Sequence, residues 1–216
     1  MEYDISSVAD NQKTVYVRWS YEIEDDRAHP YSGWNIDDIQ LWGSDFRLPE
    51  FNLDADPGWI STGEWAFGQP TGGGGTYGNP DPVSGYTGDN VYGVNLTGDY
   101  STSVGGPYYL KTGPIDCSRH NNIRLQFARW LNTDAPGYVT SKIEVSNNGI
   151  DWNTIWQHIG PSVITDSDWQ IVEYNMSSVA DYQKTVYVRW SYEIEDTHAF
   201  PYSGWNIDDI KILGDI

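Results

Sequence analysis

The sequence is poor in three kinds of feature, and each shortage excludes a class of protein. Cys117 is the single cysteine among 216 residues, so no disulfide can form within the chain. Lysines and arginines number 12 against 31 aspartates and glutamates, and the net charge of −19 opposes nucleic acid and anionic membranes as partners. No apolar run approaches the ~18 residues that a membrane span requires, which argues against membrane insertion.

Other signals are missing as well. The chain has no H-E-x-x-H motif, and its four histidines have no metal-ligand spacing. Cys117 has no histidine motif beside it, so we expect a buried structural thiol. No signal peptide begins the sequence, which says little if the chain is a piece of a longer secreted protein.

Aromatic and turn-forming residues are abundant instead. The chain has 11 tryptophans, 16 tyrosines, 22 glycines and 11 prolines. Tryptophan and tyrosine carry polar atoms and favour half-exposed surfaces and stacking sites. Glycine and proline at these numbers are typical of short strands joined by turns.

One stretch of the sequence occurs twice. Residues 2–43 recur as residues 173–214, and 33 of the 42 positions are identical. Such self-similarity predicts tandem repeats. We therefore interpret residues 45–216 as one complete repeat of a longer string, and residues 1–44 as the C-terminal fragment of a preceding repeat. One domain built on an internal duplication is the alternative.

Alternating apolar residues predict strands throughout the chain. Val15, Val17 and Trp19 alternate with more polar neighbours, which indicates a strand with one buried face. Only residues 177–181 suggest a short helical turn, so the pattern predicts an all-β antiparallel sandwich with the second copy's tryptophans, Trp190 and Trp205, inside. The predicted strands are residues 14–21, 32–42, 51–53, 59–68, 91–100, 107–116, 123–131, 138–147, 153–159, 169–174, 185–192 and 203–213.

Two strands alone cannot bury enough apolar surface to be stable. We therefore expect residues 1–44 to pair with a sheet edge of their own chain or with a neighbouring molecule, by strand addition.

Six short motifs follow one another along the chain. They are Phe51–Trp59 (FNLDADPGW), Asn95–Tyr100 (NLTGDY), Tyr109–Asp116 (YLKTGPID), Val145–Trp152 (VSNNGIDW), Val186–Trp190 (VYVRW) and Gly204–Ile210 (GWNIDDI). In this order they resemble the MAM-like group of jelly-roll domains, which includes the cleaved-adhesin domains of gingipains and the domains attached to bacterial metalloproteases of the immune inhibitor A type. The resemblance implies a concanavalin-A-like or jelly-roll sandwich, often with structural calcium, that serves adhesion or glycan binding without catalysis.

Acidic residues are the candidate metal ligands. Asp54 and Asp56 lie two positions apart, and Asp208 and Asp209 lie in the last predicted strand. The resemblance implies that the first and last strands are neighbours, which would bring these four together. Calcium prefers six to eight oxygen ligands, and a cation would relieve the repulsion between the carboxylates. Turn-capping aspartates that face water are the alternative.

Two further acidic groups are candidates. Glu193 and Asp196 belong to a second acidic cluster, for which a solvated strand edge is an equal alternative. Asp81 and Asp89 lie in the Gly/Pro-rich loop of residues 69–90, which is long enough to be functional. Paired carboxylates also leave a glycosidase open, although no isolated proton donor stands out.

Aromatic side chains are candidate sugar-stacking platforms. Tyr77 and Tyr86 lie in the Gly/Pro-rich loop, and Trp65 lies in a tryptophan-rich predicted strand. Packing of the loop is the alternative for both tyrosines.

The sequence thus predicts a non-enzymatic, calcium-stabilised module of a large extracellular or cell-surface protein. Its expected partners are a glycan or a matrix protein. A carbohydrate-binding module of a secreted hydrolase is one alternative, and a subunit that self-associates through residues 1–44 is another.

Overall fold

The computed structural model describes residues 3–9, 14–40 and 47–216, and the chain divides into two units, Met1–Ser44 and Asp45–Ile216. All strands of the described residues belong to the second unit. They are β1 (Glu50–Phe51), β2 (Ile60–Ser61), β3 (Trp65–Gly68), β4 (Val91–Val94), β5 (Gly105–Lys111), β6 (Asn121–Thr133), β7 (Val139–Ser146), β8 (Asn153–Gln157), β9 (Ile164–Thr165), β10 (Gln170–Asn175), β11 (Tyr187–Ile194) and β12 (Gly204–Asp215).

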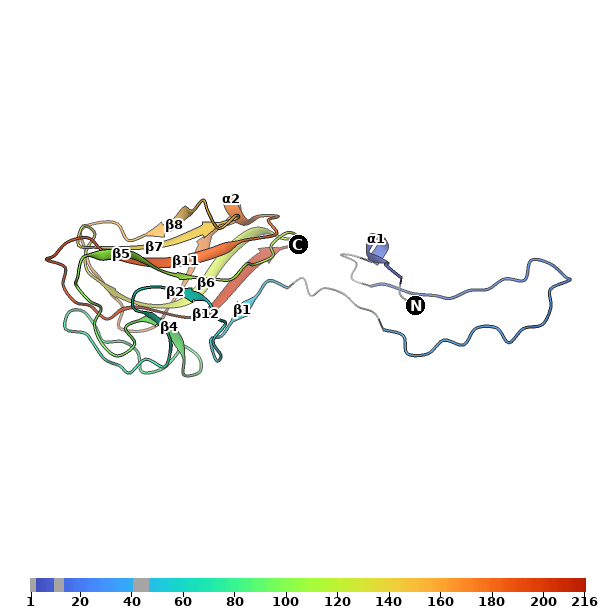
Figure 1. Ribbon diagram of the computed structural model, residues 1–216, viewed down its shortest axis with the longest axis horizontal. Coiled ribbons are helices and arrows are strands. Elements are labelled where there is room, and N and C mark those ends of the chain that lie inside the picture. Colours follow the sequence, from blue (N-terminus) through green and yellow to red (C-terminus); the bar gives the residue numbers. More distant parts are fainter. Residues whose placement is uncertain (1–2, 10–13, 41–46) are drawn as a thin grey trace. The chain divides into compact units, whose positions relative to one another are not determined.

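The strands form two antiparallel sheets, one in each layer of the sandwich (Figure 1). The first sheet has the order β10-β6-β12-β4-β3, and β1 and β9 pair with β12 and β6. The second sheet has the order β2-β5-β11-β7-β8. The predicted fold class, an all-β jelly-roll sandwich, is therefore confirmed, and the first and last strands are neighbours as expected.

The second copy of the repeated sequence supplies the centre of both sheets. Its first part ends β10 and forms the short helix α2 (Ser177–Ala180), as predicted. Its last part forms β11 and β12, each of which lies between two other strands. Trp190 and Trp205 are fully buried, as predicted, because they point from β11 and β12 into the layer between the sheets. The repeated sequence thus contributes much of the core.

One predicted strand is wrong in its extent. Residues 59–68 form two short strands, β2 and β3, which belong to different sheets. Between them Gly63 has φ +66°, and a side chain there would collide with the Tyr108 ring. The chain therefore turns at this glycine and crosses from one sheet to the other.

The described residues of the first unit have nearly the same sequence as the second copy but form no strands. They contain one helical turn, α1 (Ser6–Ala9), and otherwise form extended backbone with one turn at Asp26–Arg27. The strand predicted at residues 14–21 is therefore wrong, and so is the described part of the one at 32–42. Strands need hydrogen-bonding neighbours, and this unit offers none among its described residues. Residues 41 and 42 lie outside the described part of the chain.

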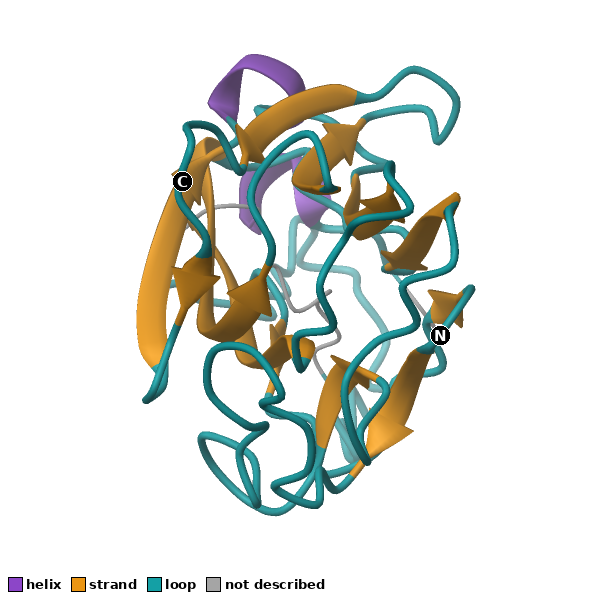
Figure 2. Cartoon of the chain, turned by 90° about the vertical axis from the view of Figure 1, so that its left-hand side faces the viewer, coloured by secondary structure: helices purple, strands orange, loops and turns teal. Residues whose placement is uncertain are grey.

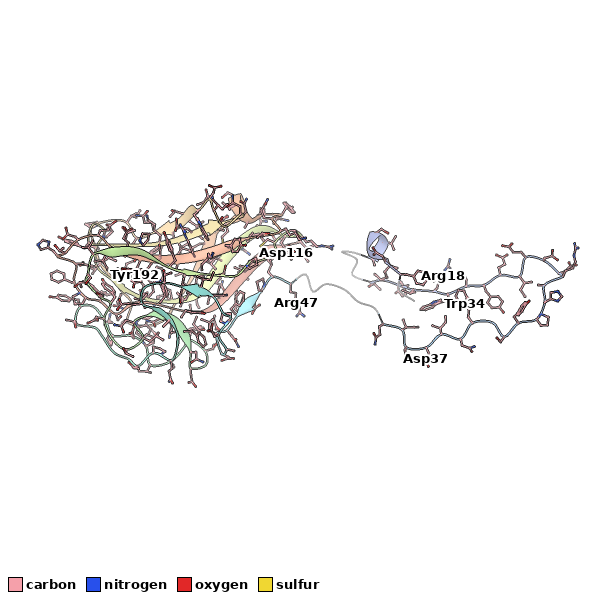
Figure 3. The ribbon with its side chains drawn as sticks, viewed as in Figure 1. Arg18, Trp34, Asp37, Arg47, Asp116 and Tyr192 are labelled. Carbon is pink, nitrogen blue, oxygen red and sulfur yellow. The ribbon has the colours of Figure 1, made fainter. Side chains whose placement is uncertain are left out.

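Side chains of the first unit are correspondingly exposed. Figure 3 shows Arg18 and Trp34 standing off extended backbone, and Trp34 is 66% exposed. Its counterpart in the second copy, Trp205, is 1% exposed. In the part of the chain that the structure describes, no helix combines the length and apolar character needed to cross a membrane.

Candidate functional site

The Gly/Pro-rich loop of residues 69–90 covers polar side chains on the outer face of the first sheet. In β12, Trp205 and Ile207 point into the core, so the alternate residues Asn206 and Asp208 point outward. Both are nevertheless fully buried. The loop is fixed over the sheet because the Nε1–H of Trp130 donates to the Pro80 carbonyl at 3.0 Å. Loops, drawn in teal, gather at one end of the sandwich (Figure 2).

One six-residue segment, residues 85–90, holds the carboxylates at the end of β12. The backbone N–H of Thr87 donates to Asp208 Oδ2 at 3.1 Å, and its hydroxyl donates to Asp209 Oδ1 at 2.8 Å. Gly85 lies so close that a side chain there would collide with Asp208 Oδ2 and the Asn90 carbonyl oxygen. Burial raises the pKa of Asp208 to about 6, although backbone hydrogen bonds from Thr87 and Asp209 oppose the shift.

The same segment contacts a third predicted ligand from its other side. Asn90 Nδ2 donates to the backbone carbonyl of Asp54 at 3.2 Å. Gly88, which has φ +60°, lies directly against Asp54 Oδ1, so no side chain fits there. Three of the four aspartates expected together, Asp54, Asp208 and Asp209, therefore contact residues 85–90.

A second buried carboxylate lies under the loop. Asn206 Nδ2 donates to Asp81 Oδ1 at 2.7 Å, and Asp81 is 3% exposed. Burial raises the pKa of Asp81 to about 7; the hydrogen bond from Asn206 opposes this shift, and the nearby charge of Asp99 contributes to it. Asp81 Oδ2 and Asn206 Oδ1 are buried and accept no hydrogen bond from the described residues. Two oxygen atoms are thus left for a proton, a water molecule or a cation.

The described part of the chain places no cationic side chain in an ion pair with the buried carboxylates of this site. None of the ion pairs among the described residues involves Asp81 or Asp208. The oxygens gathered here are carboxylates, amide oxygens and main-chain carbonyls, the donors that calcium prefers. No group of three or more acidic, histidine or cysteine side chains within the described residues is arranged to hold a metal ion. Any ion here would therefore rely on carbonyl and amide oxygens beside one or two carboxylates.

Three of the remaining predicted ligands, Asp56, Glu193 and Asp196, lie apart from this cluster. Asp56 accepts a hydrogen bond from the Tyr92 hydroxyl at 2.5 Å. Glu193 lies on β11, in the other sheet, and Asp196 pairs with the exposed His198 at 2.7 Å. Asp89 is an exposed residue of the 85–90 segment. The acidic cluster expected around Glu193 and Asp196 is therefore spread over separate contacts.

The predicted sugar platforms differ in exposure. Trp65 is 4% exposed and packs in the core against Trp205, so its assignment as a ligand-binding residue is wrong. Tyr77 is 41% exposed and stacks on Phe200 with ring centroids 4.4 Å apart. Tyr86 is 46% exposed and meets Trp169 edge-on at 6.3 Å. A sugar-binding role of the two tyrosines stays a prediction.

Sequence reasoning missed two residues of the site, Thr87 and Asn206. Asn206 had a signal, because strand alternation places it on the same face as Asp208. Thr87 had none, because its role depends on a loop that folds back over the sheet. The predicted structural thiol is confirmed, since Cys117 is fully buried and burial raises its pKa to about 12.

Comparison with known proteins gives one related sequence. Bacillopeptidase F of Bacillus subtilis (strain 168) is 28% identical over 164 residues, which are 73% of this chain. The chain spans about a tenth of the length of this curated relative. No profile of a known protein family matches the chain.

Similar folds occur among solved structures. The K1 cleaved adhesin domain of Lys-gingipain from Porphyromonas gingivalis W83 is 15% identical, covers 78% of this chain and 99% of that domain, and has a TM-score of 0.44. The module TmCBM61, solved with β-1,4-galactotriose, is 11% identical, covers 73% of this chain and 89% of the module, and has a TM-score of 0.44. The cleaved-adhesin domains named from the sequence motifs are thus among the similar structures.

Proposed function

We propose that residues 47–216 form a non-catalytic, calcium-stabilised module of an extracellular or cell-surface protein that acts in adhesion or structural assembly. The single observation that carries the calcium proposal is the burial of Asp81 and Asp208 under one loop without a cationic partner. A buried carboxylate is costly unless a proton, a donor or a cation compensates it. In a chain of net charge −19, a bound cation is the compensation that also joins the loop to β12.

Asp208 and its surroundings would hold the ion. Asp208 supplies a fixed carboxylate, and the half-buried Asp209, which accepts a hydrogen bond from the Thr87 hydroxyl, supplies a second. The carbonyl oxygens near Gly85 add neutral ligands of the kind that calcium accepts. Calcium is abundant outside cells, which supports an extracellular location. Bound calcium would fix the 69–90 loop rather than take part in a reaction.

Thermal unfolding of the full chain with calcium and with excess chelator tests this proposal. Binding to the folded state alone adds about 4 kcal/mol at a calcium concentration of 1,000 times Kd. We expect Asp208→Asn to abolish the calcium-dependent rise in Tm. Asp37→Asn is the matched control, because Asp37 occupies the same position of the first copy and is exposed. A wild-type Tm that calcium and chelator leave equal would contradict the calcium site.

A second candidate function is strand donation by the first unit. The side chains that fill the core in the second copy are exposed in the first, as the 46% exposure of Trp19 shows against the full burial of Trp190. The nine differences between the copies fall mainly outside the core. The two that align with buried residues are conservative, Ile5 with Met176 and Leu41 with Ile212. Residues 14–40 therefore carry the side chains needed to form β11 and β12 in another sandwich of this repeat.

Exchange between copies of this chain is governed by competition. Each sandwich already holds its own β11 and β12, so an incoming first unit would replace contacts with nearly identical ones. Association of two chains costs translational and rotational freedom. Because the incoming segment gains no better contacts than the resident one, this cost disfavours the exchange. A substitution that weakens the packing of the chain's own β11 should therefore favour its replacement by the first unit of another molecule.

The experiment uses Trp190→Ala in a chain that also carries Cys117→Ala, Arg18→Cys and Glu144→Cys. Arg189 is the β11 partner of Glu144, so Arg18 would take that place in an exchanged dimer. We expect a disulfide-linked dimer, lost when Trp19→Ala is added. If this Trp190→Ala chain stays monomeric and the disulfide between the two introduced cysteines does not form, strand donation is contradicted.

A further inference from the structure

The outer face of the second sheet has a small groove that the acidic site does not involve. Ser191, on the central strand β11, lies opposite Tyr109 on β5 and Lys142 on β7. A short side chain between two long ones leaves a hollow, with a cavity volume of about 50 Å³. Tyr109, Lys142, Glu144, Ser191 and Glu193 line it.

One end of this groove is held rigid by Arg189. Its guanidinium lies 4.2 Å from the Tyr109 ring centroid and 4.0 Å from that of Trp152. Its Nε–H donates to Glu144 Oε2 at 2.7 Å. Two ring faces and a carboxylate together fix the group, so its terminal N–H donors are oriented before any ligand arrives.

The groove carries charges of both signs, although the chain is strongly acidic. One cationic side chain, Lys142, and two carboxylates, Glu144 and Glu193, line it, and the guanidinium of Arg189 lies beside Glu144. None of the ion pairs among the described residues involves Lys142 or Glu193. Both therefore remain available, one as a donor and the other as an acceptor. A surface that carries charges of both signs side by side favours neither an anion nor a cation.

Neutral hydroxylated ligands suit such a surface. A sugar hydroxyl donates to a carboxylate and accepts from an ammonium or guanidinium group, while the C–H face of the ring packs on an aromatic side chain. Tyr109 supplies the ring through the face opposite Arg189, and Lys142, Glu193 and Ser191 supply polar atoms around the hollow. The cavity has room for the hydroxyl or hydroxymethyl group of one sugar unit, with the rest of the chain lying across the sheet.

Comparison of the two copies of the repeat also supports a role for this face. The residues of β11 that face outward (Tyr187, Arg189, Ser191 and Glu193) are unchanged in the first copy, as Tyr16, Arg18, Ser20 and Glu22. Core packing does not require an outward serine or glutamate. Nearby exposed positions have diverged, since Thr197 and His198 align with Asp26 and Arg27.

We propose that this groove binds a neutral saccharide, with Tyr109 as the stacking ring and Lys142 and Glu193 as the hydrogen-bonding pair. The site goes beyond the calcium proposal and does not depend on it, because it lies on the other sheet. It is also separate from Tyr77 and Tyr86, which belong to the 69–90 loop.

Native gel electrophoresis of the full chain through gels that contain soluble polysaccharides tests the proposal. The probes are xylan, mixed-linkage β-glucan, galactan and galactomannan as neutral chains, and polygalacturonate and heparin as charged ones. We expect retardation by at least one neutral polysaccharide and by neither charged one. Glu193→Gln and Lys142→Met should each weaken binding about tenfold, the effect of one hydrogen bond to a charged group.

Matched controls make the test specific. Glu22→Gln changes the same position in the first copy and should leave binding unchanged, as should Tyr77→Ala and Tyr86→Ala. Binding should survive excess chelator as long as the Tm stays above the assay temperature, which separates this site from the calcium proposal. Absence of retardation by every neutral polysaccharide would overturn the proposal. Binding that is lost with Tyr86→Ala but kept with both groove variants would also overturn it.

Discussion

Residues 14–40 and residues 185–211 have almost the same sequence but different structures. In the second copy the segment Tyr187–Ile194 is the central strand of a sheet, with hydrogen-bonded neighbours on both sides. In the first copy the corresponding residues are extended and exposed. Figure 3 shows the contrast in Trp34 of the first copy, which stands off the backbone, and Tyr192 of the second, which lies among other side chains.

This difference teaches that alternating apolar residues allow a segment to form a strand but do not suffice for it. The segment also needs neighbouring strands that bond to its backbone and a second sheet that covers its apolar face. A strand gains stability from cross-strand pairs and from burial between sheets, and both come from distant parts of the chain. Residues 47–172 provide them for the second copy. The first copy shows the same residues when no described residue of its own unit supplies a sheet.

The largest expected contrast is between the two equivalent tryptophans. Trp190→Ala removes a fully buried side chain that packs against Phe127 and Trp59, and should cost about 3–5 kcal/mol. Trp19→Ala should change stability by less than about 0.5 kcal/mol, because Trp19 lacks such packing. Urea unfolding of both variants measures the difference. Similar losses would show that the first copy is packed as well.

The next contrast concerns pH and compares Asp208 with Asp37. Burial gives folded Asp208 a pKa of about 6, above the ordinary value of 3.8. The folded state therefore binds more protons than the unfolded state between about pH 4 and pH 6, and its stability falls as pH rises through that window. In the presence of chelator, Asp208→Asn should remove the decrease in stability that occurs between about pH 4 and pH 6.

Asp37→Asn is the control for the substitution itself, since Asp37 occupies the same position of the first copy and is exposed. Asp81, whose pKa is raised to about 7, should make stability continue to decrease up to neutral pH. Asp81→Asn should remove this further decrease. Tm measured from pH 4 to pH 8 follows both effects. Identical profiles of wild type and Asp208→Asn would contradict the burial argument.

The smallest contrast uses a position where the copies differ. Phe200 stacks on Tyr77, whereas the first copy has His29 in its place. Phe200→His should cost about 0.5–1.5 kcal/mol, the contribution of an aromatic pair. The reverse change, His29→Phe, should leave the free energy of unfolding unchanged. A cost above the Trp190→Ala value would mean that the 69–90 loop depends on this pair far more than its exposure suggests.

The sequence predicted those features that depend on local pattern. Alternation located β6, β7, β11 and β12 and placed Trp190 and Trp205 inside. Motif order suggested that Asp54 and Asp208 approach one another, and both contact residues 85–90.

Features that depend on distant contacts were missed. Gly63 turns the chain between sheets because Tyr108 lies against it, which no local pattern shows. Trp65 is buried for a similar reason, since β3 brings it against Trp205. The groove at Ser191 arises from three strands that are far apart in the sequence.

Hydrogen–deuterium exchange tests the central contrast most directly, because residues 14–25 and 185–196 are identical in sequence. A peptic peptide from this region therefore samples both copies at once. We predict two mass envelopes of equal intensity, one exchanged within seconds from the first copy and one protected by the β11 hydrogen bonds. A single protected envelope would show that the first copy also forms strands, and would contradict the account.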